Sequence, residues 1–407
     1  MIREIIKFIR EKEIYILISF CLIVTIIAHS AELTLHISQT HMLDLARSFL
    51  HGKLTVSLFP NRDDLAFYNG NYYVYFGFFP ALLLMPLVVL FHIQSQWGLI
   101  PIATLFAARC LYLLAKDMDL SPKQSLWIVV AFFFGTIYFF LSLVDITAYY
   151  IQVLGIDFLI LALYFFICKK QIVISSLFFC FAFLTRQTLL LAICFFIAEM
   201  IFEEQTWRST RKNFLLFCIP VIGAISLLSV YNSVRFGSPF DNGYAYNIAT
   251  KKVPIMYGLF SLRYIPANIY FMLFKGLDGL VKNNTILRFP YYKADYMGLG
   301  MFFTSPFFFY VFLAKFRAKH VLSSLITILV LASFVLLFYN SGFWQYGYRY
   351  ALDFYPFLFL ILISVFRKYF TNMTKISILY AICFNAFFMF SIWGTYPFLP
   401  KIFWFHN

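Results

Sequence analysis

The stretch from Asn61 to Pro86 combines acids, tyrosines and a tight turn, which are residue types that can do acid–base chemistry on a bound substrate. It reads NRDDLAFYNGNYYVYFGFFPALLLMP, and the adjacent acids Asp63 and Asp64 lie near its start. A carboxylate that neighbouring groups keep ionised can accept a proton from a hydroxyl or an amide. Asp64 opens the aromatic run, so we predict that it is a general base. The alternative is that it only supports the turn at Asn69-Gly70.

Other acids near apolar runs are alternatives for the base: Glu32, Asp44, Asp63 and Asp145. Asp44 lies in an amphipathic stretch, His41 to His51, whose apolar residues share one face of the expected helix. Its carboxylate is then on the polar face, where it could simply be solvated. The Asp63-Asp64 pair could bind a divalent metal, although adjacent carboxylates on a loop are weak support for such a site. No cofactor is required by the sequence, and its use of metal stays open.

A second group of polar residues lies in the stretch NSGFWQYGYRYALDFYPF. Gln345, Arg349 and Asp353 are four residues apart and would share one face of a helix. The planar guanidinium of Arg349 can bind a phosphate in bidentate fashion, pair with Asp353, or do both. Further candidates for binding a substrate or its phosphate come from the expected outer loops and helix ends: Arg186, Arg235, Arg263, His41 and Tyr73.

The composition assigns the chain to the all-α polytopic membrane proteins. Its 407 residues are 62% hydrophobic and 12% charged, with a mean hydropathy of +0.81. A soluble domain of this length could not bury so much apolar surface. The net charge of +14 fits lysine and arginine on cytoplasmic loops facing anionic lipid headgroups, so we expect a lipid bilayer and no nucleic acid as partner.

Apolar runs predict about eleven membrane-spanning helices within a single membrane domain over residues 1–407. We expect spans near 14–32, 98–115, 126–143, 149–168, 172–186, 187–202, 214–234, 298–314, 321–338, 351–366 and 376–393. The basic residues near the start place the N-terminus in the cytoplasm, and the later basic loops agree with this only if residues 78–93 do not cross, so this segment is predicted to be an outer juxtamembrane helix. The outer loops are then 33–76, which carries the catalytic candidates, and 235–297, which has eight basic and three acidic residues.

Four separate stretches resemble the GT-C superfamily of membrane glycosyltransferases, of the protein O-mannosyltransferase and aminoarabinose-transferase type and its bacterial family-39-like subgroup. They are THMLDLARSFLHGKL, DLAFYNGNYYVYFGFFPALLLMP, NSVRFGSPFDNGYAY and FWQYGYRYALDFYPF. The resemblance implies a GT-C-like fold in the bacterial cytoplasmic membrane and an extracytoplasmic active site in the first outer loop. It also implies inverting sugar transfer from a polyprenyl-phosphate donor to a lipid, glycan or protein. The family's base usually lies in an Asp-Glu pair after the first span, where this chain has Ser38 and Gln39.

Other functions remain open from the sequence. A flippase or transporter for a lipid-linked sugar would place charges at the middle of the membrane, and Asp157 lies inside an expected span. A polysaccharide polymerase or ligase would share the donor chemistry, and a non-catalytic scaffold is a further alternative. The sequence has no zinc-ligand spacing, Walker loop, GxGxxG or GxSxG motif.

Overall fold

A computed structural model describes residues 15, 17–23, 25–26, 39–57, 64–203, 207–248, 255–282, 286–293, 295, 297–318, 320–342 and 345–395. Only the backbone is described at 280–282, 288–290, 293 and 390–395. The candidate acids Glu32 and Asp63 therefore lie outside the described residues. The described part of the first expected span, between 15 and 26, is helical.

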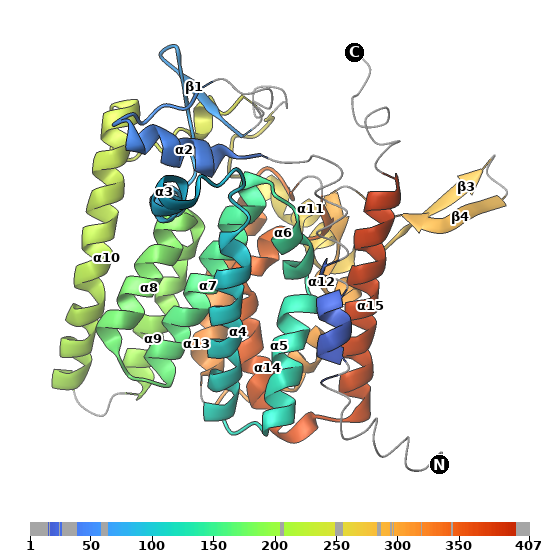
Figure 1. Cartoon of the computed structure of the whole chain (residues 1–407). Helices are drawn as coiled ribbons and strands as arrows, with labels where there is room; N and C mark the ends of the chain where they lie inside the picture. The colour runs from blue at the N-terminus through green and yellow to red at the C-terminus, as the bar shows by residue number, and fades with distance from the viewer. Residues whose placement is uncertain are drawn as a thin grey trace.

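The described chain forms a bundle of apolar helices that run roughly side by side (Figure 1). Its main helices are α4 (Leu99–Asp117), α5 (Pro122–Phe134), α7 (Thr147–Ile167), α8 (Ile172–Thr185), α9 (Ile193–Glu203), α10 (Trp207–Phe236), α13 (Val321–Leu337), α14 (Tyr355–Tyr369) and α15 (Asn372–Thr395). Helix α7 is almost wholly buried and packs against both α4 and α8.

Five helical segments in the described residues are long and apolar enough to cross a membrane: 99–117, 147–167, 207–236, 349–369 and 372–389. Five more apolar helices are shorter, with 10–17 residues each. The helical, membrane-type architecture expected from the composition is thus confirmed, whereas the number of about eleven crossings stays a prediction.

Two expected spans are not continuous α-helices. The run 126–143 divides into α5 and the short α6 (Tyr138–Leu143), and the run 298–314 divides into α12 (Met301–Thr304) and the 3-10 helix η6 (Pro306–Leu313). The two breaks contact each other, because Ser305 Oγ donates a hydrogen bond to the carbonyl oxygen of Gly135 over 2.7 Å. Proline at 306 also prevents α12 from continuing. The expected span 187–202 likewise begins as a 3-10 helix, η1 (Gln187–Ala192), before α9.

One end of the bundle is covered by elements from the first expected outer loop (Figure 1). Helix α2 (His41–Leu50) packs against α3 (Phe79–Phe91), and the β1 (Ala66–Tyr68)–β2 (Asn71–Tyr73) hairpin lies beside them. Asn69 and Gly70 have φ angles of 47° and 78°, as a two-residue hairpin turn requires, so the predicted turn is confirmed. Helix α3 has 13 residues and is not among the span-length helices. That it does not cross the membrane stays a prediction.

The expectation of an all-α chain is corrected by small sheets. The described residues contain three two-stranded sheets: β1–β2, β3 (Asp278–Lys282)–β4 (Ile286–Lys293), and the parallel pair β5 (Met297–Leu299)–β6 (Gln345–Gly347). The second outer segment also contains η2 (Tyr244–Tyr246), η4 (Leu262–Tyr264), α11 (Ile265–Ile269) and the π-helical turn η5 (Tyr270–Phe274). Helix α14 is preceded by the 3-10 helix η7 (Arg349–Phe354).

Candidate active site

Asp64 lies directly before the β1–β2 hairpin and has an unusual backbone conformation. Its φ angle is 66°, in the left-handed region that non-glycine residues seldom adopt. Tyr75 Oη donates a hydrogen bond to Asp64 Oδ1 over 3.0 Å, and Asn247 Nδ2 donates to Tyr75 Oη over 3.0 Å. An antiparallel β-bridge between Ala66 and Asn247 joins the two outer segments close to Asp64. Tyr75 therefore contacts the carboxylate directly, and Asn247 of the second outer segment supports Tyr75.

The partner of Asp64 is a buried and protonated phenol. Tyr75 is 6% exposed, and burial together with the negative charge of Asp64 raises the pKa of Tyr75 well above its usual value. The phenol therefore stays protonated at neutral pH and donates a hydrogen bond to the carboxylate, which favours the ionised form of Asp64.

Arg349, at the first position of η7, lies near this carboxylate. Its guanidinium carbon is 5.3 Å from the ring centre of Tyr149 and 4.7 Å from that of Tyr350, and Nη2 donates to Tyr350 Oη over 3.3 Å. Arg349 also interacts electrostatically with Asp64 and Tyr75. Among the described residues, its buried Nε has no hydrogen-bond partner. A guanidinium stacked on rings, with a donor left unused, is suited to binding an anion.

Tyrosines from separate parts of the chain surround these two charges, and we call them the tyrosine cluster: Tyr75, Tyr149, Tyr244, Tyr339 and Tyr350. The rings of Tyr75 and Tyr244 meet edge to face at 5.3 Å, and Tyr244 Oη lies 3.2 Å from Tyr339 Oη. The cluster thus combines the loop after β2, the start of α7, η2, the segment after α13, and η7.

Sequence reasoning selected Asp64 and Arg349 but missed their tyrosine partners and Asn247. Tyr75 and Tyr244 lie in two of the stretches that resemble known glycosyltransferases, which was the available signal. With 28 tyrosines in the chain, residue type by itself could not distinguish these from tyrosines that only pack.

The expected pairing of Arg349 with Asp353 is wrong. Asp353 is fully buried and pairs with Arg186, whose Nε lies 2.7 Å from its Oδ1. Thr188 Oγ1 donates to Asp353 Oδ2 over 2.8 Å, and Gln152 Nε2 donates to Oδ1 over 3.0 Å. Since these three donors hold the carboxylate, Asp353 fixes Arg186 and η1 against η7 and leaves Arg349 to the tyrosine cluster.

Gln345 does not share a helical face with Arg349 and Asp353, contrary to the expectation from their spacing. It belongs to β6, and its Nε2 donates to the carbonyl oxygens of Met297 and Ser341 over 2.6 and 3.0 Å. Its Oε1 accepts a hydrogen bond from the backbone N–H of Arg349 over 3.1 Å. The side-chain amide therefore positions the backbone of Arg349.

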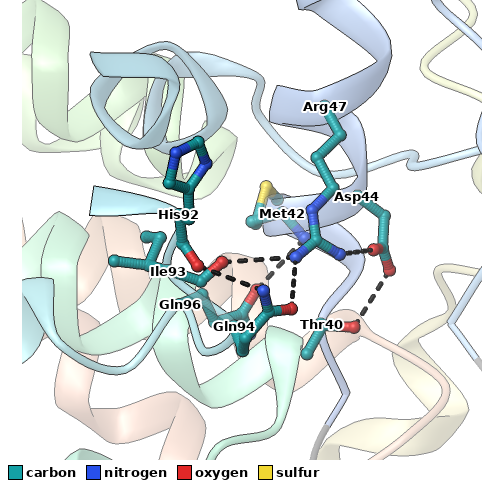
Figure 2. Close-up of polar contacts among 8 residues, drawn as sticks. All are labelled: Thr40, Met42, Asp44, Arg47, His92, Ile93, Gln94 and Gln96. Carbon is teal, nitrogen blue, oxygen red and sulfur yellow. Dashed lines mark hydrogen bonds and ion pairs between the residues drawn. The ribbon is translucent and has the colours of Figure 1, made fainter. Parts of the chain in front are cut away.

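Asp44 is buried, which corrects the expectation of a solvated polar face. Its side chain is 4% exposed; Thr40 Oγ1 donates to Oδ2 over 3.0 Å, and Arg47 Nη1 lies 3.5 Å from Oδ1 (Figure 2). Arg47 Nη2 donates to Ile93 O and to Gln94 Oε1 over 3.2 and 2.8 Å. Burial raises the pKa of Asp44, while Thr40 and Arg47 lower it. This group joins the start of α2 to the segment after α3.

The neighbouring amide of Gln96 continues this network (Figure 2). Its Oε1 accepts from the backbone N–H of Met42 over 3.1 Å, and its Nε2 donates to Gln39 O over 2.7 Å. Asp145 belongs to the same region, where Ser95 Oγ donates to its Oδ2 over 3.0 Å. The alternative bases Asp44 and Asp145 therefore both lie in a hydrogen-bonded network that connects structural segments.

Arg235 is a buried link between elements. It is 3% exposed, and its guanidinium carbon lies 3.8 Å from the ring centre of Tyr231. Nη1 donates to Val74 O over 2.7 Å and Nη2 to Asn232 Oδ1 over 2.9 Å. These contacts attach the hairpin to the end of α10.

The remaining candidates are dispersed. The ring of Tyr73 packs against Phe236 at 5.3 Å, and Arg263 is exposed and stacks on Tyr257 at 4.3 Å. His41 is 2% exposed at the start of α2. In the part of the chain that the structure describes, no three histidine, cysteine, aspartate or glutamate side chains gather as a metal site would require.

No known protein-family profile and no curated protein sequence matches the chain. The structure resembles the apo oligosaccharyltransferase of Archaeoglobus fulgidus, with a TM-score of 0.40 and 14% identity over 93% of this chain and 55% of the other. The same enzyme, AglB, in complex with an inhibitory peptide and a dolichol-phosphate gives a TM-score of 0.41 and 14% identity over 92% and 56%. This chain spans about half of those proteins. Scores this low do not establish a shared activity.

Proposed function

We propose that this protein is a GT-C-type membrane glycosyltransferase that moves a sugar from a polyprenyl-phosphate donor to an acceptor on the outer side of the membrane. One observation carries the proposal: Asp64 and Arg349, which are 285 positions apart, both contact the tyrosine cluster, Asp64 through Tyr75 and Arg349 through Tyr149 and Tyr350. A base and a phosphate-binding cation are the two charges that such a transfer needs.

In the proposed reaction, Asp64 removes the proton from the acceptor hydroxyl or amide as that atom attacks the anomeric carbon. The bond between this carbon and the donor phosphate oxygen breaks, and both bonding electrons leave with the phosphate. Arg349 stabilises the additional negative charge through its guanidinium N–H groups. Since the acceptor attacks opposite the leaving phosphate, the configuration at the anomeric carbon is inverted.

The family that the chain resembles carries an acidic pair where this chain has Ser38 and Gln39, so Asp64 is our choice of base and Glu32, the acid nearest to that position, is the alternative. Gln39, one of the two residues at that position, is a neutral amide that is 9% exposed. The backbone carbonyl oxygen of Gln39 accepts hydrogen bonds from Gln96 Nε2 and Thr147 Oγ1. A neutral amide cannot accept the acceptor's proton at neutral pH, so the base must come from another residue. Asp64 has the strained backbone that often accompanies functional sites.

A lipid phosphate suits the surroundings of Arg349. The guanidinium lies among aromatic rings at the end of a candidate membrane span, where a phosphate attached to an apolar polyprenyl chain would arrive. A transport function has less support. The buried Asp157 accepts hydrogen bonds from Tyr138 and Thr104 over 2.8 and 3.3 Å, which is a structural arrangement.

The test is binding of polyprenyl phosphate to the purified full-length protein in detergent. We expect saturable binding, and a photoreactive polyprenyl phosphate should cross-link to residues of the tyrosine cluster. Polyprenyl alcohol, which lacks the phosphate, is the matched control and should bind much more weakly. Equal binding of the alcohol and the phosphate, or cross-linking confined to other helices, would exclude the proposed donor site.

A further inference from the structure

A polar concavity lies at the opposite end of the bundle from the tyrosine cluster. It has a volume of about 340 Å³ and is formed where α5 and α15 begin. Its walls include Lys123, Gln124, Trp127, Phe370, Asn372 and Lys375. We call it the basal cavity. The proposed sugar transfer makes no use of it.

The charges around the basal cavity favour an anion. Among the described residues that line it, Lys123 and Lys375 are basic and none is acidic. The nearby carboxylate of Asp119 is already paired, since Arg367 Nη2 lies 2.9 Å from its Oδ2. The described side chains that line the cavity therefore carry two positive charges.

Two helix N-termini reinforce this preference. Ser121 and Gln124 form a reciprocal capping box at the start of α5. At the start of α15, Thr371 and Thr374 exchange side-chain hydrogen bonds with each other's backbone N–H groups over 3.4 and 3.2 Å. The caps use only part of the donors in each first turn, and the remaining N–H groups carry the positive ends of the helix dipoles.

Trp127 provides an independent indication of a ligand. Its side chain is 3% exposed and lines the cavity, and its indole N–H has no hydrogen-bond partner among the described residues. A buried indole N–H normally has an acceptor. Lys375 Nζ lies 5.8 Å from the centre of this ring, so a bound anion could contact both groups.

We propose that the basal cavity binds the phosphate group of an anionic phospholipid. The phosphate would accept hydrogen bonds from Lys123, Lys375 and Trp127 and from the first turns of α5 and α15. A lipid is favoured over free phosphate because α15 is a candidate membrane span and α5 is apolar, so the cavity lies where headgroups meet helix ends.

The test measures the lipid retained by the full-length protein after extraction from vesicles of mixed phosphatidylglycerol and phosphatidylcholine, using native mass spectrometry. The wild type should retain phosphatidylglycerol selectively. The double variant Lys123→Gln/Lys375→Gln should retain it roughly 10- to 30-fold less well, because two charges near the headgroup are lost. Trp127→Phe should give a smaller loss in the same direction.

The double variant Lys116→Gln/Lys169→Gln is the matched control, because it removes equal charge from the ends of α4 and α7 outside the cavity. It should retain phosphatidylglycerol as the wild type does, and circular dichroism should confirm that all variants are folded. An equal loss in this control would overturn the proposal, since the effect would be one of overall charge. Displacement of the lipid by millimolar inorganic phosphate would overturn the assignment to a lipid.

Discussion

Asp44 and Asp64 lie 20 positions apart in the first expected outer loop, and each is close to an arginine, but their surroundings differ. Asp44 and Arg47 are one helical turn apart; Thr40 donates to Asp44, and Arg47 donates to backbone and side-chain oxygens of the segment after α3 (Figure 2). Asp64 and Arg349 come together only through the fold, and Arg349 Nε has no partner in the described structure.

The difference separates a structural acid from a candidate catalytic one. In the Asp44 group the arginine donates to three other residues, so it mainly joins segments. At the tyrosine cluster, Asp64 accepts a hydrogen bond from the phenol of Tyr75. Arg349 packs against aromatic rings, and its Nε has no hydrogen-bond partner among the described residues. The Nε of Arg349 is therefore a donor that a substrate could use, which the Asp44 group does not provide among the described residues.

The largest expected effect is that of Asp64→Asn, which keeps the shape of the side chain and removes the base. We expect turnover to fall by about 10²- to 10⁴-fold, while binding of polyprenyl phosphate is retained. Turnover would be followed as release of polyprenyl phosphate from sugar-loaded donor extracted from membranes. Asp44→Asn is the matched control and should keep most activity. If Asp44→Asn is inactive while Asp64→Asn is active, Asp44 is the base and Asp64 is the structural acid.

Arg349→Gln should weaken binding of polyprenyl phosphate by roughly 10- to 100-fold. The physical reason is the loss of a charge-assisted contact, worth about 1.5–3 kcal/mol. The affinity would be measured by titration in detergent. Arg47→Gln removes the same charge from the Asp44 group and should leave the affinity unchanged. Normal affinity in a folded Arg349→Gln protein would exclude Arg349 as the phosphate ligand.

Tyr75→Phe should reduce turnover by about 5- to 10-fold, because Asp64 loses a hydrogen bond worth about 1–1.5 kcal/mol. Tyr68→Phe is the control, since Tyr68 lies in the same hairpin and its hydroxyl donates to the carbonyl oxygen of Phe236. Equal losses in both variants would mean that the hairpin responds to any lost hydroxyl and that Asp64 has no special dependence on Tyr75.

The smallest effect is expected for the stability of Asp44→Asn. Burial raises the pKa of Asp44 in the folded state above its usual value of 3.8, so the folded protein binds this proton more tightly than the unfolded chain does. The free energy of unfolding therefore includes a favourable contribution from Asp44 that is complete below pH 3.8 and is lost as the pH rises through the pKa of the folded state. The amide does not ionise, so the variant should lose this pH dependence and differ from the wild type by less than about 1 kcal/mol at neutral pH. Thermal unfolding as a function of pH checks this, and a strongly destabilised variant at pH 7 would contradict it.

Local residue patterns predicted several features correctly because each depends on near neighbours. Asn69-Gly70 adopts the positive φ angles of a hairpin turn, the stretch from His41 forms α2, and Gly52 follows its end with a φ of 67°. Long apolar runs likewise gave most of the bundle helices, since hydrophobicity over about 20 residues depends little on the rest of the fold.

Other features required the tertiary structure. The sequence placed Arg349 beside Asp353 by spacing, but Arg186, 167 positions away, takes that carboxylate and leaves Arg349 to the tyrosine cluster. The sequence also could not show that Asp44 would be buried, because Ile93 and Gln94, which bind the neighbouring Arg47, lie after α3 in the chain. The sequence by itself determined the apolar helices, the turn and the candidate charges, whereas long-range packing decided which charges pair, because burial and the choice of partner depend on residues distant in the chain.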